Sequence, residues 1–178
     1  MARLGRLFSV HRLEVVRRRL RRAAHGLAGR RRMVVVPLLE PEHTRHALDL
    51  ACLLAAERGS RVLLLAPLFV DWELPLDAHF KTEQTALRVE LDRERALAES
   101  YGISAHGTVV RARHGELGRA VAEAAEDVRA SMIVVGAAVE SQRGLRQPFS
   151  RDVWSVLQDA PCRVMITTGA GTCPRAAA

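Results

Sequence analysis

Residues 131–168 read SMIVVGAAVESQRGLRQPFSRDVWSVLQDAPCRVMITT. The apolar run 132–135 predicts a buried strand that ends at Gly136, and a loop then leads to a helix over about 150–158. The run 162–167 predicts a second short strand. These elements form one βαβ unit, whose loop lies at the carboxyl end of the first strand. Ligands bind there in open parallel sheets, because the helix N-terminus directs its free N–H groups at that place. The stretch therefore predicts a fold and a site together.

The sequence before this unit repeats the same alternation of strand and helix. Its first run, 33–39, is apolar throughout, as expected for a strand buried on both faces. The remaining pattern predicts further strands over 61–67 and 104–111 and helices over 42–58, 81–101 and 116–129. The predicted fold class is α/β, with a doubly wound sheet of five parallel strands. Right-handed crossovers and the buried first strand place that strand at the centre.

Length and composition indicate one globular domain with an appendage. The chain has 178 residues, of which 48% are hydrophobic and 26% charged. Apolar runs such as 62–70 are far shorter than the roughly 20 residues that span a bilayer, and the start of the chain lacks the pattern of a secretory signal. Three cysteines, Cys52, Cys162 and Cys173, lack metal-binding spacing. We therefore expect reduced thiols in a cytoplasmic protein.

The positive charge is concentrated at the N-terminus. Residues 1–32 hold eleven arginines and one acid, Glu14, a net charge of +10, which leaves −3 of the total +7 for residues 33–178. We divide the chain into a basic amphipathic arm (1–32), a domain (33–169) and a disordered tail (170–178). The high isoelectric point belongs to the arm, and the domain is mildly acidic.

The arm has the pattern of a basic amphipathic helix between residues 12 and 28. Apolar side chains share one helical face, and arginines cover the rest: Arg17, Arg18, Arg19, Arg21 and Arg22. Such a helix suits an anionic membrane surface, an acidic partner or nucleic acid. The alternatives are a solvated or domain-packed helix and an organellar transit peptide. With only seven aromatic residues in the chain, we do not expect nucleic-acid binding.

A long loop, 69–80, separates the second predicted strand from the helix that follows it. It contains Asp71, Trp72, Pro75 and Asp77. Connections of this length are uncommon in α/β domains, and they often have a function or cover a site.

Five short motifs resemble the universal stress protein family over about residues 31–169, and more narrowly the stress-protein domains appended to permeases of the amino acid–polyamine–organocation superfamily. The motifs are Leu74-Pro75-Leu76-Asp77-Ala78, Ala98-Glu99-Ser100-Tyr101-Gly102, Val110-Arg111-Ala112-Arg113, Ile133-Val134-Val135-Gly136 and Ala160-Pro161-Cys162-Arg163-Val164-Met165. The resemblance implies the strand order 3-2-1-4-5. It also implies a homodimer formed through the last strand, Cys162 to Thr167.

The resemblance further implies a possible ATP or AMP site, but its residue pattern is broken. Members that bind these nucleotides have a loop of glycine, two residues, glycine, nine residues, glycine and a serine or threonine. Counted from Gly136, the later glycines are replaced by Val139 and Phe149, and Ser150 takes the hydroxyl position. Counted back from Ala160, Ser150 takes the third glycine position and Arg151 the hydroxyl position. We prefer the second register, because an insertion is easier in a loop than in a helix.

The end of the first strand also departs from the nucleotide-binding pattern. Leu39 stands where nucleotide-binding members carry an aspartate near the adenosine. Replacing the glycines removes left-handed backbone conformations that turn N–H groups toward phosphate. Arg143, Gly144, Arg146 and Arg151 still lie near a helix N-terminus. Three outcomes stay open: tight ATP binding, weak or altered binding of an anion or nucleotide, and no ligand. The candidate binding residues are Leu39, Gly136, Arg143, Gly144, Ser150 and Arg151.

Other residue patterns give little support to catalysis. His43 and His46 flank a helix start without a third ligand, so we expect no metal site. His114 and Glu116 follow a strand end without a nucleophile beside them. Ser150 is not in a Gly-x-Ser-x-Gly turn. We therefore expect no enzyme activity.

The sequence favours a non-enzymatic regulatory or accessory module. We expect a cytoplasmic homodimer whose basic arm associates with a transporter or with the membrane surface. The alternative function is an ATP- or AMP-binding stress sensor with a degenerate phosphate loop.

Overall fold

The computed structural model describes residues 33–139 and 148–168. Five parallel strands form one sheet in the order β3-β2-β1-β4-β5. The strands are β1 (Met33–Pro37), β2 (Arg61–Phe69), β3 (Ala105–Ala112), β4 (Ala130–Gly136) and β5 (Arg163–Thr167). The helices are α2 (Pro41–Arg58), α3 (Lys81–Ser100), α4 (Leu117–Asp127) and α5 (Arg151–Asp159). The predicted α/β class, parallel sheet and strand order are confirmed.

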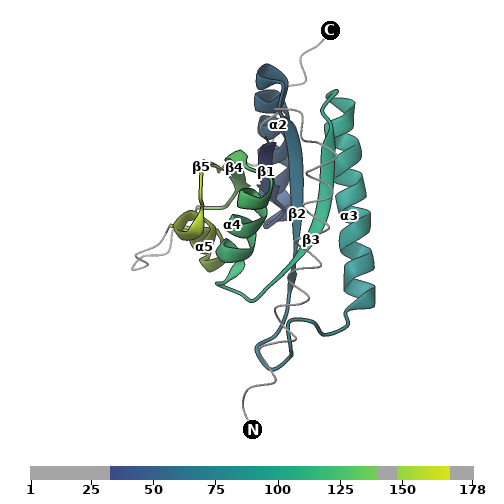
Figure 1. Ribbon diagram of the computed structural model, residues 1–178, viewed down its shortest axis with the longest axis vertical. Helices are drawn as coiled ribbons and strands as arrows, with labels where there is room; N and C mark the ends of the chain where they lie inside the picture. Colours follow the sequence, from purple (N-terminus) through teal and green to yellow (C-terminus); the bar gives the residue numbers. More distant parts are fainter. Residues whose placement is uncertain (1–32, 140–147, 169–178) are drawn as a thin grey trace.

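The helices cover the sheet from both sides (Figure 1). Helices α2 and α3 pack on one face, and α4 and α5 lie together over the other. Each face has its own apolar core. Along β1, Val34 and Val36 enter the core under α2 and α3, whereas Val35 enters the core under α4. This alternation explains why the strand is apolar at every position: both of its faces are buried.

The predicted element boundaries differ from the observed ones by one or two residues. Strand β1 ends at Pro37 rather than residue 39, because the chain must turn into α2, whose first residue is Pro41. Strand β2 continues beyond residue 67 because Phe69 still pairs with Ala112 of β3. Strand β5 begins at Arg163, so the predicted dimer strand was one residue too long at Cys162.

The described cysteines agree with reduced thiols. Cys52 is free and fully buried in the core under α2, where burial, reinforced by the charge of Asp49, raises the pKa of its thiol to about 12. Cys162 is free and half-buried, and burial raises its pKa as well. Cys173, the arm and the tail lie outside the described residues.

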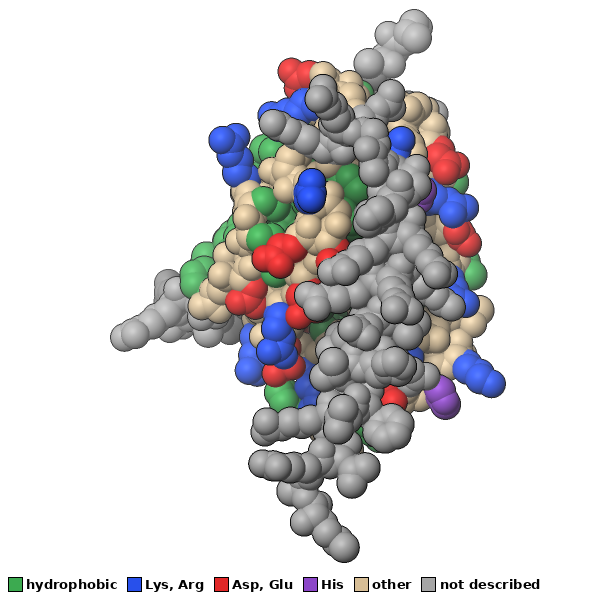
Figure 2. All heavy atoms as spheres, viewed as in Figure 1, with side chains coloured by type: hydrophobic (Ala, Val, Ile, Leu, Met, Phe, Trp, Pro, Cys, Tyr) green, Lys and Arg blue, Asp and Glu red, His purple; other side chains and the backbone are tan. Residues whose placement is uncertain are grey.

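One face of the described residues is mixed in charge. On the face drawn in Figure 2, acidic and basic side chains are interspersed. Within residues 33–139 and 148–168, no helix is long and apolar enough to cross a bilayer.

Helices α4 and α5 touch through a residue without a side chain. The Gly118 N–H donates to Ser155 Oγ at 2.9 Å, and a Cβ on Gly118 would collide with the Ser155 carbonyl oxygen. The two helix backbones can approach this closely only because Gly118 has no Cβ.

We predict that Gly118→Ala destabilises the protein by more than about 3 kcal/mol, because the clash is with backbone and overpacking already costs 1–3 kcal/mol where side chains can yield. Urea denaturation of the full chain measures this change. The matched control is Gly107→Ala, whose added Cβ would lie 3.1 Å from the Cβ and Cδ2 of Leu91, a milder clash that a shift of a few tenths of an ångström relieves. If both variants lost the same free energy of unfolding, the close approach of the two helix backbones at Gly118 would not be what makes glycine necessary there.

Candidate functional site

The site lies at the carboxyl edge of the sheet, between β1 and β4. The chain leaves β1 for α2 on one face and leaves β4 for α5 on the other, so the connections diverge here (Figure 1). Ligands of parallel sheets bind at such a divergence, and we call this edge, beside the starts of α2 and α5, the crevice. This is the place that the sequence predicts for a ligand.

Glu40 crosses this crevice. It is the N-cap residue of α2, and its backbone carbonyl accepts the N–H groups of His43 and Thr44. Its side chain reaches the other side of the crevice, where Oε2 accepts the Ala138 N–H at 2.7 Å. Oε1 accepts the Ser150 hydroxyl at 3.3 Å. One carboxylate thus connects the β1–α2 turn, the segment after β4 and the start of α5.

The electrostatic setting suits a negative group. Backbone N–H groups and the positive ends of helix dipoles stabilise anions at helix starts. The Glu40 carboxylate lies between the first residues of α2 and α5, and His43 Nε2 is 3.9 Å from its Oε2. Its side chain is 28% exposed, so the contact is only partly shielded from water. The chain therefore supplies its own anion to the crevice.

Gly136 has a packing role that the sequence did not reveal. It ends β4, and a Cβ on it would collide with the His43 carbonyl oxygen and lie 3.0 Å from the His43 Cβ. The first turn of α2 therefore rests directly on the end of β4. Among the described glycines, Gly59, Gly102 and Gly115 have positive φ, and Gly136 does not. Glycine is needed here for close approach rather than for a left-handed turn.

The other predicted site residues occupy different surroundings. Leu39 and Phe149 pack against the core beneath α4 and α5, whereas Val139 is 53% exposed. Ser150 is the N-cap residue of α5, and within the described residues its hydroxyl bonds to Glu40 rather than capping its own helix. The Arg151 guanidinium lies against Gly115 in the β3–α4 loop. Arg143, Gly144 and Arg146 lie outside the described residues, so both alignment registers of the loop stay predictions.

A second polar cluster joins α5 to the β3–α4 loop. His114 Nδ1 lies 2.9 Å from Asp152 Oδ2, and the Gly115 N–H donates to Asp152 Oδ1 at 2.6 Å. The His114 ring stacks on Phe69, with centroids 4.0 Å apart. The contacts of the described residues bring no hydroxyl or thiol to His114, and Glu116 pairs with Arg119 at 3.6 Å. The cluster connects the start of α5 to the β3–α4 loop, and its described contacts place no nucleophile beside His114.

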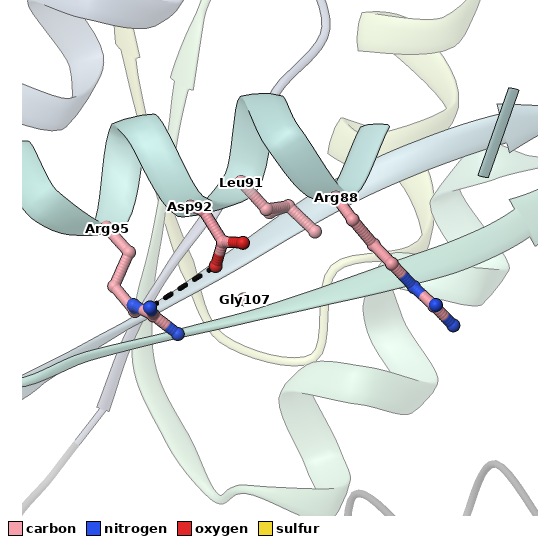
Figure 3. Close-up of a pocket in the computed structure, with 5 residues that line it drawn as sticks. All are labelled: Arg88, Leu91, Asp92, Arg95 and Gly107. Carbon is pink, nitrogen blue, oxygen red and sulfur yellow. Dashed lines mark ion pairs between the residues drawn. The ribbon is translucent and has the colours of Figure 1, made fainter. Parts of the chain in front are cut away.

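Two shallow hollows lie away from the crevice. One, of about 170 Å³, is lined by α3 and β3 (Figure 3). In it Asp92 and Arg95 turn toward each other at 3.3 Å, and Arg88 extends in another direction. The other, of about 410 Å³, lies on α4 and the end of α5 and carries Glu116, Glu123, Glu126 and Asp159. The described residues contain no group of three or more side chains that could hold a metal ion.

Glu40 is the site residue that the sequence reasoning missed. The resemblance predicts an acid one position earlier, where this sequence has Leu39. The available signal was an acid directly before a proline at the end of the central strand, since proline often takes the first helical position. A helix start at 41 rather than 42 would have placed Glu40 at the N-cap.

We predict that Glu40→Ala lowers the free energy of unfolding by about 1–2 kcal/mol, because a hydrogen bond to a charged group is lost from a partly exposed site. Chemical denaturation monitored by circular dichroism measures the loss. Glu42→Ala is the matched control: Glu42 is an exposed acid in the first turn of the same helix. Should both variants lose the same small amount, the contacts across the crevice would not contribute to stability.

The sequence comparison identifies the family, and the structure comparisons show the same fold. The sequence model of the universal stress protein family matches residues 30–168. A universal stress protein from Archaeoglobus fulgidus is similar in structure, with a TM-score of 0.59 and 20% identity over 76% of this chain and 92% of that one. A universal stress protein in complex with cAMP gives a TM-score of 0.58 and 20% identity over 78% of this chain and 97% of that one.

A third structure, an Archaeoglobus fulgidus universal stress protein in complex with dAMP, gives a TM-score of 0.54 and 17% identity over 76% of this chain and 96% of that one. At these identities the structural likeness establishes the fold alone. No curated protein sequence matches this chain significantly.

Proposed function

The chain belongs to the universal stress protein family, and we propose that it is a non-enzymatic regulatory module whose crevice is filled by its own carboxylate rather than by a nucleotide phosphate. The module would then act by binding a partner protein or a membrane surface. The cytoplasmic location, the homodimer and the link to transporter-associated domains belong to the same proposal.

The observation that supports this proposal is the contact between Glu40 Oε2 and the Ala138 N–H, at 2.7 Å. A phosphate that approached this N–H would meet the carboxylate already bonded to it. Two like charges about 4 Å apart repel by about 4 kcal/mol at an effective dielectric constant of 20. Partial exposure of Glu40 reduces this cost, but a reduced cost still weakens nucleotide binding by an order of magnitude or more.

We predict that the wild-type protein shows no binding of AMP or ATP at millimolar concentration in calorimetry with magnesium present. Glu40→Gln removes the negative charge and keeps the shape, so we expect it to bind roughly ten- to a hundredfold more tightly. Glu42→Gln serves as the control, with no expected gain. Micromolar binding by the wild type would overturn the proposal, and no gain in Glu40→Gln would show that Glu40 does not exclude phosphate.

A second candidate function is an adenine-nucleotide sensor, and the partial exposure of Glu40 favours it. A rotation of this side chain would release the Ala138 N–H and the Ser150 hydroxyl beside the start of α5 for a phosphate. Structures of the family with cAMP and dAMP motivate this alternative. The same titration separates the two functions, because a sensor would bind in its wild-type form and lose affinity in Ser150→Ala. Replacing Val139 and Phe149 with glycine would raise the affinity for the nucleotide if the loop directs its N–H groups at the phosphate.

The proposed partner contacts involve two parts of the chain. Strand β5 is an edge strand of the described sheet, and its residues Val164, Met165 and Ile166 are half-buried, which suits pairing with a second copy. Residues 1–32 carry a net charge of +10, which suits an anionic leaflet at roughly 1 kcal/mol per basic residue near the surface.

We predict that the full-length chain binds vesicles containing anionic lipid and that deletion of residues 1–32 abolishes this binding, because the rest of the chain carries a net charge of −3. Vesicle co-sedimentation at low and high salt measures it, with uncharged vesicles as the control. Unchanged binding after the deletion would exclude the arm as the membrane contact. Steep salt dependence with duplex DNA but not with anionic vesicles would favour nucleic acid instead.

A further inference from the structure

The loop between β2 and α3 presents an unusual surface. Its sequence from Asp71 to Asp77 contains three acids and four apolar residues, and all seven are exposed. Trp72 is 61% exposed, Leu74 40% and Leu76 39%. These are three of the seven large apolar side chains that are exposed among the described residues. Such a concentration within five residues marks an interaction surface rather than scattered apolar exposure.

Two arginines from β3 and the turn after it hold this loop in place. Arg111 Nη1 donates to the carbonyl oxygens of Leu76 at 2.8 Å and Ala78 at 2.7 Å. Arg113 donates to the carbonyls of Trp72 at 3.0 Å and Leu74 at 3.2 Å. Four loop carbonyls are therefore bonded to guanidinium groups, which fixes the backbone while the apolar side chains stay exposed.

The Trp72 ring has a further contact with Arg113. The Arg113 guanidinium carbon lies 4.6 Å from the centre of the Trp72 ring, within the range of a cation–π interaction. The ring is held in this way and yet remains 61% exposed. An exposed aromatic side chain that does not have to be ordered on binding is a suitable anchor for a partner.

We infer that this loop surface, defined as residues 71–77, is the docking site for residues 12–28 of the same chain. The chemistry is complementary: residues 12–28 combine an apolar face with Arg17, Arg18, Arg19, Arg21 and Arg22, and the loop combines apolar side chains with the exposed acids Asp71 and Glu73. Five of the eleven arginines of residues 1–32 lie between residues 17 and 22, whereas residues 33–178 carry a net charge of −3, so the attraction is concentrated in this part of the segment. This docking is separate from the membrane contact proposed above and competes with it.

The length of the chain permits this docking. Met33 pairs with Arg61 at the start of β2, whereas the loop lies beyond Phe69, at the lower end of the molecule in Figure 1. The nine residues of β2 extend about 30 Å at roughly 3.3 Å each. A helix over 12–28 would be about 25 Å long at 1.5 Å per residue. The four residues between it and Met33 add five Cα–Cα steps, which can span about 17 Å more. The distance from Met33 to the loop is therefore within reach.

The test uses Trp72 as a fluorescent reporter in the full-length chain, with Trp154→Phe so that it is the only tryptophan. Acrylamide, an uncharged quencher, measures how open the ring is to solvent. We expect the quenching constant to rise roughly twofold when the five arginines at 17, 18, 19, 21 and 22 are changed to glutamate, since charge reversal releases the segment. It should rise similarly in 1 M salt, where the screening length falls to about 3 Å.

The matched control changes five other arginines of the same terminal segment, Arg3, Arg6, Arg30, Arg31 and Arg32, to glutamate, and should leave the quenching constant unchanged. Equal denaturation midpoints show that the fold is intact in both variants. The reference is the Trp154→Phe chain with its arginines unchanged. Quenching identical to this reference in the variant with glutamate at 17, 18, 19, 21 and 22 would overturn the inference. So would shielding that depends on protein concentration, because the segment would then come from a second copy. Vesicle binding is a separate readout, so its failure leaves this result unaffected.

Discussion

The first turn of α2 rests on the end of β4 without any side chain between them, and much of the site depends on this close approach. Gly136 permits it, because a Cβ there would collide with the His43 carbonyl oxygen. The approach brings the N-cap residue of α2 within reach of the segment after β4, so the Glu40 side chain can bond to Ala138 and Ser150. A glycine that the family pattern assigns to phosphate binding thus also determines how two elements of the fold meet.

The sequence predicted the fold well because the fold depends on local patterns. Continuous apolar runs identify the strands that are buried on both faces, and the helices show their apolar periodicity. The site depends on contacts between distant residues, and no local pattern encodes them. Glu40 meets Ala138 and Ser150 across 98 and 110 positions of sequence, and Arg111 and Arg113 meet the long loop across 33 to 41 positions. The loop could be recognised as unusual, but the residues that hold it could not.

In the proposed function, Glu40 preserves the backbone of the crevice in place of a ligand. An N–H group at the carboxyl edge of a parallel sheet must be paired, whether by water, by a ligand or by the protein itself. A carboxylate from the neighbouring turn provides a partner of the same charge as a phosphate. The backbone of the crevice can then be retained while its affinity changes. Membership of a family defined by its fold is therefore compatible with different ligands, or with none.

The hydrogen bonds from Arg111 and Arg113 to the long loop have a consequence for how the loop can change in evolution. Arg111 and Arg113 bond to main-chain carbonyls, which every residue has, so the four hydrogen bonds do not require particular loop side chains. The ring of Trp72 itself contacts Arg113, but exposed side chains such as Leu74 and Leu76 can be exchanged without removing these four bonds. Mutation can therefore alter what the loop recognises while its shape is preserved. The separation of a fixed support from a replaceable surface would let related chains acquire new partners without first having to rebuild the domain.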